Sequence, residues 1–145
     1  MEVSLEVLLN TIREQTIYHF AQNPPAGIAN HYHLCVKLNE NYLLFGCLTS
    51  QENTMNRLIQ LQGLDPCTIV AIKKDESNSL PKDWSYINCN NVYQMTADEF
   101  HAYYREGNVS FKGELSASDY YQVLIGIKQS RLVATEIKEL IPDID

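Results

Sequence analysis

The 145-residue chain has no apolar run approaching the ~20 residues with which a helix crosses a membrane. Its first residues, Met1-Glu2-Val3-Ser4, are acidic and polar, and they lack the basic region that opens a secretory signal peptide. No internal repeat or low-complexity segment interrupts it. We therefore expect a cytoplasmic protein without a membrane partner.

Cysteine pairs of the C-x-x-C type are also absent, although the chain has four cysteines. They stand singly, at Cys35, Cys47, Cys67 and Cys89. Isolated cysteines of this kind are typical of reduced, buried thiols rather than of a disulfide framework. His31, His33 and Cys35 fall on one side of a predicted strand, but no further cluster of ligands accompanies them. We therefore predict neither a metal site nor a cofactor.

Positive charge is scarce, because 11 Lys and Arg stand against 18 Asp and Glu, for a net charge of −7. Such a chain repels phosphate on average, which counts against nonspecific nucleic-acid binding but leaves room for a local cationic cleft. The length suits one domain, residues 1–145. A chain of this size can bury roughly two-thirds of its unfolded surface without a disulfide or metal.

The strongest pattern is a predicted hairpin of two strands, residues 31–38 and 42–50. Asn39-Glu40-Asn41 forms the turn, since asparagine tolerates the backbone angles of short turns. Strand side chains alternate, so odd- and even-numbered residues of the first strand should face opposite ways. The odd face would carry His31, His33, Cys35 and Lys37. The second strand is apolar and ends at Thr49-Ser50, so the hairpin brings histidines and hydroxyls together.

The remaining chain reads as a mixture of helices and strands. Apolar residues near helical spacing predict a helix over residues 4–20, within an N-terminal helical segment 1–22 that packs Leu5, Leu9 and Ile12 on the sheet or on a second copy. Residues 51–57, polar and without period, predict a loop. The other predicted elements are strands at 67–72, 84–95 and 109–112, and helices at 97–105, 117–133 and 135–140. This order indicates an α+β fold with a small, strongly curved antiparallel sheet.

These features resemble the MazF/PemK-like toxins of bacterial toxin–antitoxin systems. In that family a strand beginning His-Arg-Pro is followed by one ending in Thr-Thr or Thr-Ser. His31-Tyr32-His33-Leu34-Cys35-Val36 and Cys47-Leu48-Thr49-Ser50 take those places here. The family's later strand, Gly-x-Leu/Val-Ser segment and terminal helix are matched by Trp84–Met95, Gly113-Glu114-Leu115-Ser116 and Ala117–Val133.

The resemblance implies an SH3-like antiparallel β-barrel over residues 30–141 with a C-terminal amphipathic helix. It also implies a toxin that is a metal-independent endoribonuclease, cleaves single-stranded RNA and leaves a cyclic 2′,3′-phosphate. The expected partners are an antitoxin protein, single-stranded RNA and a second copy of the chain in a homodimer.

Catalysis in this interpretation depends on His31, His33 and Thr49. A neutral histidine can take the proton of a ribose 2′-hydroxyl, and a protonated one can give a proton to the leaving 5′-oxygen. The resemblance implies that Thr49 is a catalytic threonine. The substrate-binding residues would be Lys37, Ser50 and Arg57, which can hold phosphate by charge or by hydrogen bonds.

One position departs from the family, because Tyr32 stands where the family has its catalytic Arg. An alternative interpretation is therefore a barrel without catalysis that binds a protein or RNA, with His31 and His33 as surface residues. The acidic charge and the absent Arg favour this module. Thr49-Ser50 and the two histidines favour the nuclease.

Overall fold

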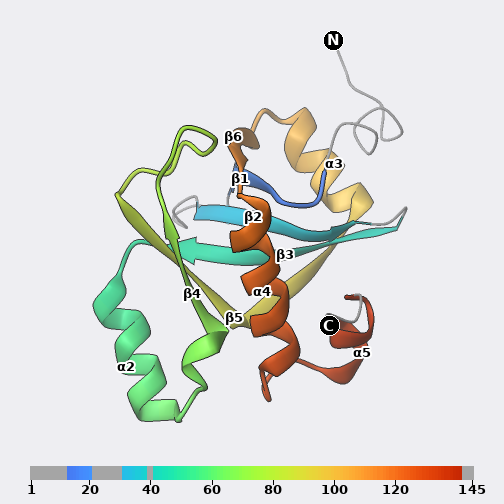
Figure 1. Ribbon diagram of the computed structural model, residues 1–145. Coiled ribbons are helices and arrows are strands. Elements are labelled where there is room, and N and C mark those ends of the chain that lie inside the picture. Colours follow the sequence, from blue (N-terminus) through green and yellow to red (C-terminus); the bar gives the residue numbers. More distant parts are fainter. Residues whose placement is uncertain (1–12, 21–30, 39–40, 142–145) are drawn as a thin grey trace.

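The computed structural model describes residues 13–20, 31–38 and 41–141, which form an α+β fold (Figure 1). The strands are β1 (Thr16–Phe20), β2 (His31–Leu38), β3 (Tyr42–Thr49), β4 (Ile69–Lys73), β5 (Trp84–Thr96) and β6 (Ser110–Glu114). The helical elements are α2 (Glu52–Gln62), the 3-10 turn η1 (Pro66–Thr68), α3 (Ala97–Arg105), α4 (Ala117–Gln129) and α5 (Thr135–Glu139). None of the helices in these ranges is long and apolar enough to cross a membrane.

The six strands form one antiparallel sheet in the order β4-β5-β3-β2-β1-β6, curled into a half-barrel. The chain after β4 turns back onto β6, at the other edge of the sheet. There Asn78 bridges Gly113, and Ser79 N donates to Lys112 O at 2.8 Å. Gly113 has φ +103, and a Cβ at this position would overlap the carbonyl oxygen of Ser77. Only glycine therefore fits where the two edges meet.

Each face of the sheet is covered by a different helix, and we name the faces after them. On the α4 face, Val123 and Ile127 belong to an aliphatic cluster with sheet residues such as Leu34. On the α3 face, Phe100 lies in an aromatic cluster and its ring is 5.5 Å from that of Phe45. Figure 1 shows α4 running across the sheet and α3 at its upper side. Burial on both faces explains why several strands are apolar almost throughout.

The predicted N-terminal helix is wrong over its last residues, because Thr16–Phe20 form strand β1. In β1, Ile17 pairs with Leu34 of β2, and Tyr18 pairs with Phe111 of β6. β-branched and aromatic residues favour a strand, and burial on both faces produces an apolar run that resembles helical spacing. Residues 1–12, with the predicted Leu5, Leu9 and Ile12 stripe, and residues 21–22 lie outside the described residues.

Most other predicted elements are confirmed. β2 and β3 form the predicted hairpin strands, and α4 and α5 the two C-terminal helices. The predicted capping box is present, with Thr96 Oγ1 accepting from Glu99 N. The loop predicted at 51–57 is wrong, because this stretch belongs to α2. Only Met55 of α2 is buried, so polar residues cover most of the helix and its apolar period is weak.

Candidate functional site

His33, one of the predicted catalytic residues, is fully buried on the α3 face, at 0 % exposure. Its ring stacks on Phe20 with centroids 4.1 Å apart and meets the rings of Phe45 and Tyr93 at steep angles. Nε2 lies 3.0 Å from the Phe20 carbonyl oxygen, and Nδ1 lies 2.7 Å from the Tyr93 hydroxyl. With both ring nitrogens occupied inside an aromatic cage, His33 offers no atom to a substrate.

The neighbours of His33 assign its protonation state. A carbonyl oxygen only accepts, so Nε2–H donates to Phe20. Burial raises the pKa of Tyr93 far above its ordinary value of 10.0, so the Tyr93 hydroxyl keeps its proton and can donate it to Nδ1 of a neutral ring. The dry aromatic surroundings also disfavour a charged ring. His33 is therefore a neutral imidazole that ties β1, β2 and β5 together.

Lys37 and Arg57, which are predicted to bind phosphate, do not form one site with His33. A register shift between Cys35 and Lys37 places Lys37 opposite Leu44, a residue of the α4 face. The Lys37 ammonium pairs with the Glu14 carboxylate at 3.4 Å. Arg57 is exposed on α2. The expected cationic cleft around the histidines is not formed by these two residues.

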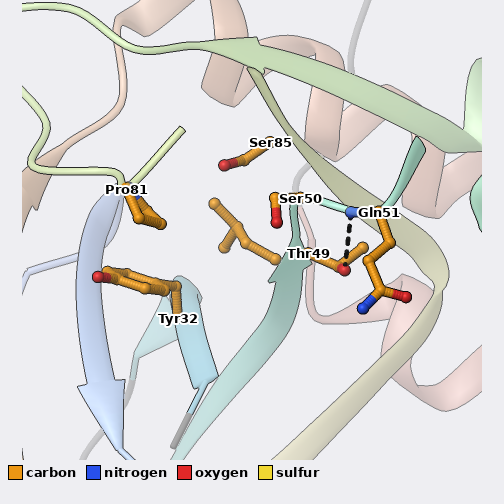
Figure 2. A pocket seen from close by; sticks show the side chains of 7 residues that line it. Tyr32, Thr49, Ser50, Gln51, Pro81 and Ser85 are labelled. Atoms are coloured by element: carbon orange, nitrogen blue, oxygen red, sulfur yellow. Dashed lines mark hydrogen bonds between the residues drawn. The ribbon is translucent and has the colours of Figure 1, made fainter. Parts of the chain in front are cut away.

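A small cavity opens at the start of β2, where β3 ends and β5 begins (Figure 2). It encloses about 210 Å³ and is lined by Tyr32, Leu48, Thr49, Ser50, Gln51, Pro81 and Ser85. We call it the Ser85 pocket. Leu48 pairs with Tyr32 on one side and with Ile87 on the other, and Ile87 lies two residues after Ser85. Tyr32, Leu48 and Ser85 therefore share the α4 face, and the pocket lies where the aliphatic cluster ends.

Ser85 is a buried residue whose hydroxyl no other described residue binds. The residue is 2 % exposed, and its backbone pairs with Ile72 of β4. Figure 2 shows the hydroxyl turned toward the space between Pro81 and Ser50. No sealed side-chain nitrogen or oxygen among the described residues lacks a hydrogen-bond partner, so the Ser85 hydroxyl is open to the pocket and to water. A ligand that reaches this pocket can therefore bond the hydroxyl in place of water.

Ser50 and Gln51, the two residues before α2, border the same pocket. The Gln51 side chain makes no capping bond, and its amide oxygen accepts from the Thr54 hydroxyl at 3.1 Å instead. The hydrogen bond from Met55 N to Gln51 O, at 3.3 Å, opens the helix, so the amides before Met55 have no intrahelical acceptor. A helix N-terminus of this kind carries partial positive charge and attracts oxyanions.

Thr49 and Ser50 are the predicted site residues that the structure brings together. Thr49 Oγ1 accepts from Gln51 N at 3.2 Å, as Figure 2 shows, while Ser50 is exposed at the rim. Tyr32, in the place of the family's Arg, forms a wall of the pocket. His31 begins β2 at this same end and its backbone pairs with Phe20. The side chain of His31 lies outside the described part of the chain.

Among its described lining residues, the Ser85 pocket offers hydrogen-bond donors but no acid or base. Four of these residues carry hydroxyls, and none of them is His, Lys, Arg, Asp or Glu. Donors beside a helix N-terminus suit a carboxylate or phosphate oxygen, whereas proton transfer needs a positioned group that titrates near the working pH. Within the described ranges, no three His, Cys, Asp or Glu side chains are grouped as a metal site.

Ser85 and Pro81 were missed by the sequence analysis. Ser85 stands at an inward position of a strand, two residues before the buried Ile87, where the alternation calls for an apolar side chain. A polar residue at such a core position is the sequence signal that could have identified Ser85 as a candidate site residue. Pro81 belongs to a loop, and nothing in the sequence indicates which cavity a loop will border.

No protein-family model matches the chain, and no curated protein matches it significantly. The interpretation of the Ser85 pocket therefore depends on its own geometry.

Proposed function

We propose that this protein is a binding module without catalytic activity, whose Ser85 pocket takes a carboxylate group of a protein partner. The proposal develops the alternative interpretation of the sequence, in which a MazF/PemK-like barrel binds without cleaving. One observation carries it. His33, one of the two histidines expected to move protons, is buried on the α3 face, while the described residues of the pocket on the α4 face offer donors but no acid or base.

An SH3-like barrel is the finer assignment that we propose for the sheet. The six antiparallel strands and the contact between Asn78 and Gly113, which brings the sheet edges together, support it. The long strand β5 and the terminal helix α4 follow in the order that the resemblance implies. Strand β1 is an addition to that pattern, in the place of a predicted helix.

A carboxylate suits the pocket better than RNA for two reasons. Nucleic-acid binding draws most of its affinity from Lys and Arg, and neither occurs among the described residues that line this pocket, in a chain of net charge −7. The volume of about 210 Å³ is below the ~300–1,000 Å³ of pockets that enclose whole small molecules. It fits one acidic side chain, or a C-terminal carboxylate, presented by a peptide such as a segment of an antitoxin.

The test is selection of binding peptides from a random displayed library on the intact protein. We expect the selected peptides to share an Asp, a Glu or a free C-terminus, and amidation or Glu→Gln exchange in the peptide to weaken binding. Ser85→Ala should weaken binding about tenfold or more, because a hydrogen bond to a charged group contributes ~1.5–3 kcal/mol. Ser79→Ala, at an exposed serine outside the pocket, is the matched control.

Two outcomes would contradict the proposal. The first is a set of peptides without a common acidic group, or peptides that bind Ser85→Ala as tightly as the wild type. The second is tighter binding of single-stranded RNA than of any peptide, with Ser85→Ala weakening the RNA complex.

A metal-independent endoribonuclease is the second candidate, supported by Thr49 and Ser50 at the pocket and by His31 at the start of β2. It predicts cleavage of single-stranded RNA to a cyclic 2′,3′-phosphate in the presence of EDTA. His31→Ala should then lower the rate ~10²–10⁴-fold, as loss of a positioned acid or base does, and Thr49→Ala should lower it less. Such cleavage would replace the binding proposal, whereas intact RNA after long incubation would exclude the nuclease.

A further inference from the structure

A second cavity lies at the other end of α2, around its C-terminus. It encloses about 470 Å³, and the lining residues that matter are Leu64, Asp65, Pro66, Thr68, Asn90 and Arg131. We call it the Arg131 pocket. It shares no lining residue with the Ser85 pocket, and the helix between them has 11 residues, or a length of ~16 Å. The proposed function does not use this cavity.

One wall of the Arg131 pocket is a continuous chain of hydrogen bonds. Ser130 Oγ donates to Asn90 Oδ1 at 2.6 Å, and Asn90 Nδ2 donates to Thr68 Oγ1 at 2.7 Å. Thr68 Oγ1 in turn donates to the Asp65 carbonyl oxygen at 2.6 Å. Ser130 and Thr68 are both buried. Because these bonds join the end of α4 to β5 and η1, the wall is held in place before any ligand arrives.

Arg131 reaches from the end of α4 to the C-terminus of α2. Its Nη2 donates to Gln62 O at 2.8 Å and to Gly63 O at 3.2 Å. These bonds stabilise a helix end that has no basic residue in its own last turn. Nη1 and Nε make no hydrogen bond to any described residue, so an oriented guanidinium with unused donors lines the cavity.

Asp65 brings the opposite charge to the same cavity. Its Oδ1 accepts from Cys67 N at 3.0 Å and caps η1. That hydrogen bond lowers the pKa of Asp65, so the carboxylate is ionised at neutral pH. The Cys67 thiol also hydrogen-bonds the Asp65 side chain, and Asp65 and Arg131 form no ion pair with each other. The cavity therefore carries two opposite charges that do not neutralise one another directly.

From this geometry we propose that the Arg131 pocket binds a free α-amino acid as its zwitterion. The ligand carboxylate accepts from the free N–H groups of Arg131, and the ligand ammonium donates to Asp65. A simple anion meets repulsion from Asp65 and a simple cation meets repulsion from Arg131, so a ligand with both charges is favoured. The volume of about 470 Å³ lies within the ~300–1,000 Å³ of small-molecule pockets. Leu64 and Pro66 offer apolar contact to an aliphatic side chain.

Isothermal titration of the intact protein with L-leucine, L-leucinamide and N-acetyl-L-leucine tests the proposal. L-Leucine is expected to bind. Each analogue lacks one of the two charges, and its affinity should be lower by about tenfold or more. The other L-amino acids are titrated singly in case the pocket prefers another side chain. Equal binding of N-acetyl-L-leucine shows a carboxylate site only, and equal binding of L-leucinamide an ammonium site only. Either result, or no binding of any amino acid at millimolar concentration, overturns the proposal.

Variants locate the site. Asp65→Asn keeps an oxygen that can cap η1 but removes the charge, so it should lower affinity for L-leucine about tenfold with little change in melting temperature. Arg131→Lys keeps the charge but loses the planar fork, and should also weaken binding. Asp98→Asn, at an exposed residue of α3, is the matched control. Unchanged affinity in Asp65→Asn would contradict the site. Ser85→Ala should bind L-leucine with unchanged affinity. The proposal for the Arg131 pocket is therefore tested independently of the proposal for the Ser85 pocket.

Discussion

His33 and Ser85 are both buried polar residues of one sheet, but they lie on opposite faces and differ in whether their side chains are hydrogen-bonded within the protein. His33 on the α3 face has both ring nitrogens hydrogen-bonded and aromatic rings packed around it. Ser85 on the α4 face has a hydroxyl without a partner in the described part of the chain, and a cavity beside it. A satisfied buried group contributes to folding, whereas a hydroxyl that opens into a cavity can bond a ligand. This difference is why we propose a structural role for the histidine and a binding role for the serine.

The largest effect on folding should come from removing the satisfied group. His33→Ala deletes a ring from the aromatic cluster, removes two hydrogen bonds and leaves Tyr93 without its acceptor. We expect the free energy of unfolding to fall by about 3–5 kcal/mol, measured by urea denaturation. A fall below about 1 kcal/mol, which is ordinary for a surface or tolerant position, would contradict the structural role.

A smaller loss of stability should follow when one hydrogen bond of His33 is removed. Tyr93→Phe keeps the ring but removes the hydrogen bond between the Tyr93 hydroxyl and Nδ1 of the buried His33. Removing one partner of a buried hydrogen bond costs about 1–3 kcal/mol, and thermal unfolding should show a loss of that size. Tyr104→Phe, at an exposed tyrosine of α3, is the matched control. Equal melting temperatures for the two variants would mean that the bond to His33 contributes nothing.

The thiols sharpen the comparison, because Cys35 lies on the α3 face and Cys89 on the α4 face. Burial raises the pKa of Cys35 strongly, and it raises the pKa of Cys89 from 9.0 to about 12. A raised pKa keeps the thiol protonated, so its contribution to stability is complete below pH 9.0 and is lost as the pH rises toward 12. Near neutral pH we expect neither thiol to react with a thiol reagent.

Cys67, which is exposed, provides the internal control for that titration. Desolvation and the hydrogen bond to Asp65 raise its pKa, but because it is accessible it should react faster than Cys35 and Cys89 in the native protein, and Cys67→Ser should remove this faster phase. Rapid labelling of Cys35 in the folded protein would mean that reagent reaches the core of the α3 face, which would contradict the burial of this face.

The smallest effect on stability should come from Ser85→Ala. The hydroxyl makes no bond to a described residue, so its removal should change the free energy of unfolding by no more than about 0.5 kcal/mol. The same variant should lose peptide binding. A loss of stability as large as that of Tyr93→Phe would mean that Ser85 is bonded within the protein, and would remove the contrast with His33.

Local patterns predicted much of the fold. The hairpin, the capping box at Thr96 and the terminal helix α4 depend on side-chain alternation, capping and helical period, which act over a few residues. β1 was misread because its apolar residues face two cores, and α2 because it presents little apolar surface to any core. Both errors come from burial, which is a property of the assembled sheet.

Of the candidate site, only Thr49 and Ser50 could be placed from the sequence, at the end of the second strand of the hairpin. The alternation of β2 correctly predicted that His33 and Tyr32 point to opposite faces of the sheet. It did not predict which face α3 would cover and which face would end in a cavity. Ser85 reaches the pocket from a strand that pairs with β3 from the other side, and Pro81 from a loop. Long-range pairing of this kind has no signature in neighbouring residues.

The sequence by itself determined the charge of the protein, the hairpin, the caps and the alternation that separates His33 from Tyr32, because these follow from residue type and spacing. The tertiary structure alone decided that His33 is enclosed by Phe20, Phe45 and Tyr93, and that Ser85 is left unpaired beside a helix N-terminus. It also brought Asp65 and Arg131 to one cavity. The physical reason is that solvation, pairing and cavity shape depend on which distant segments meet, and a single chain position records only its own chemistry.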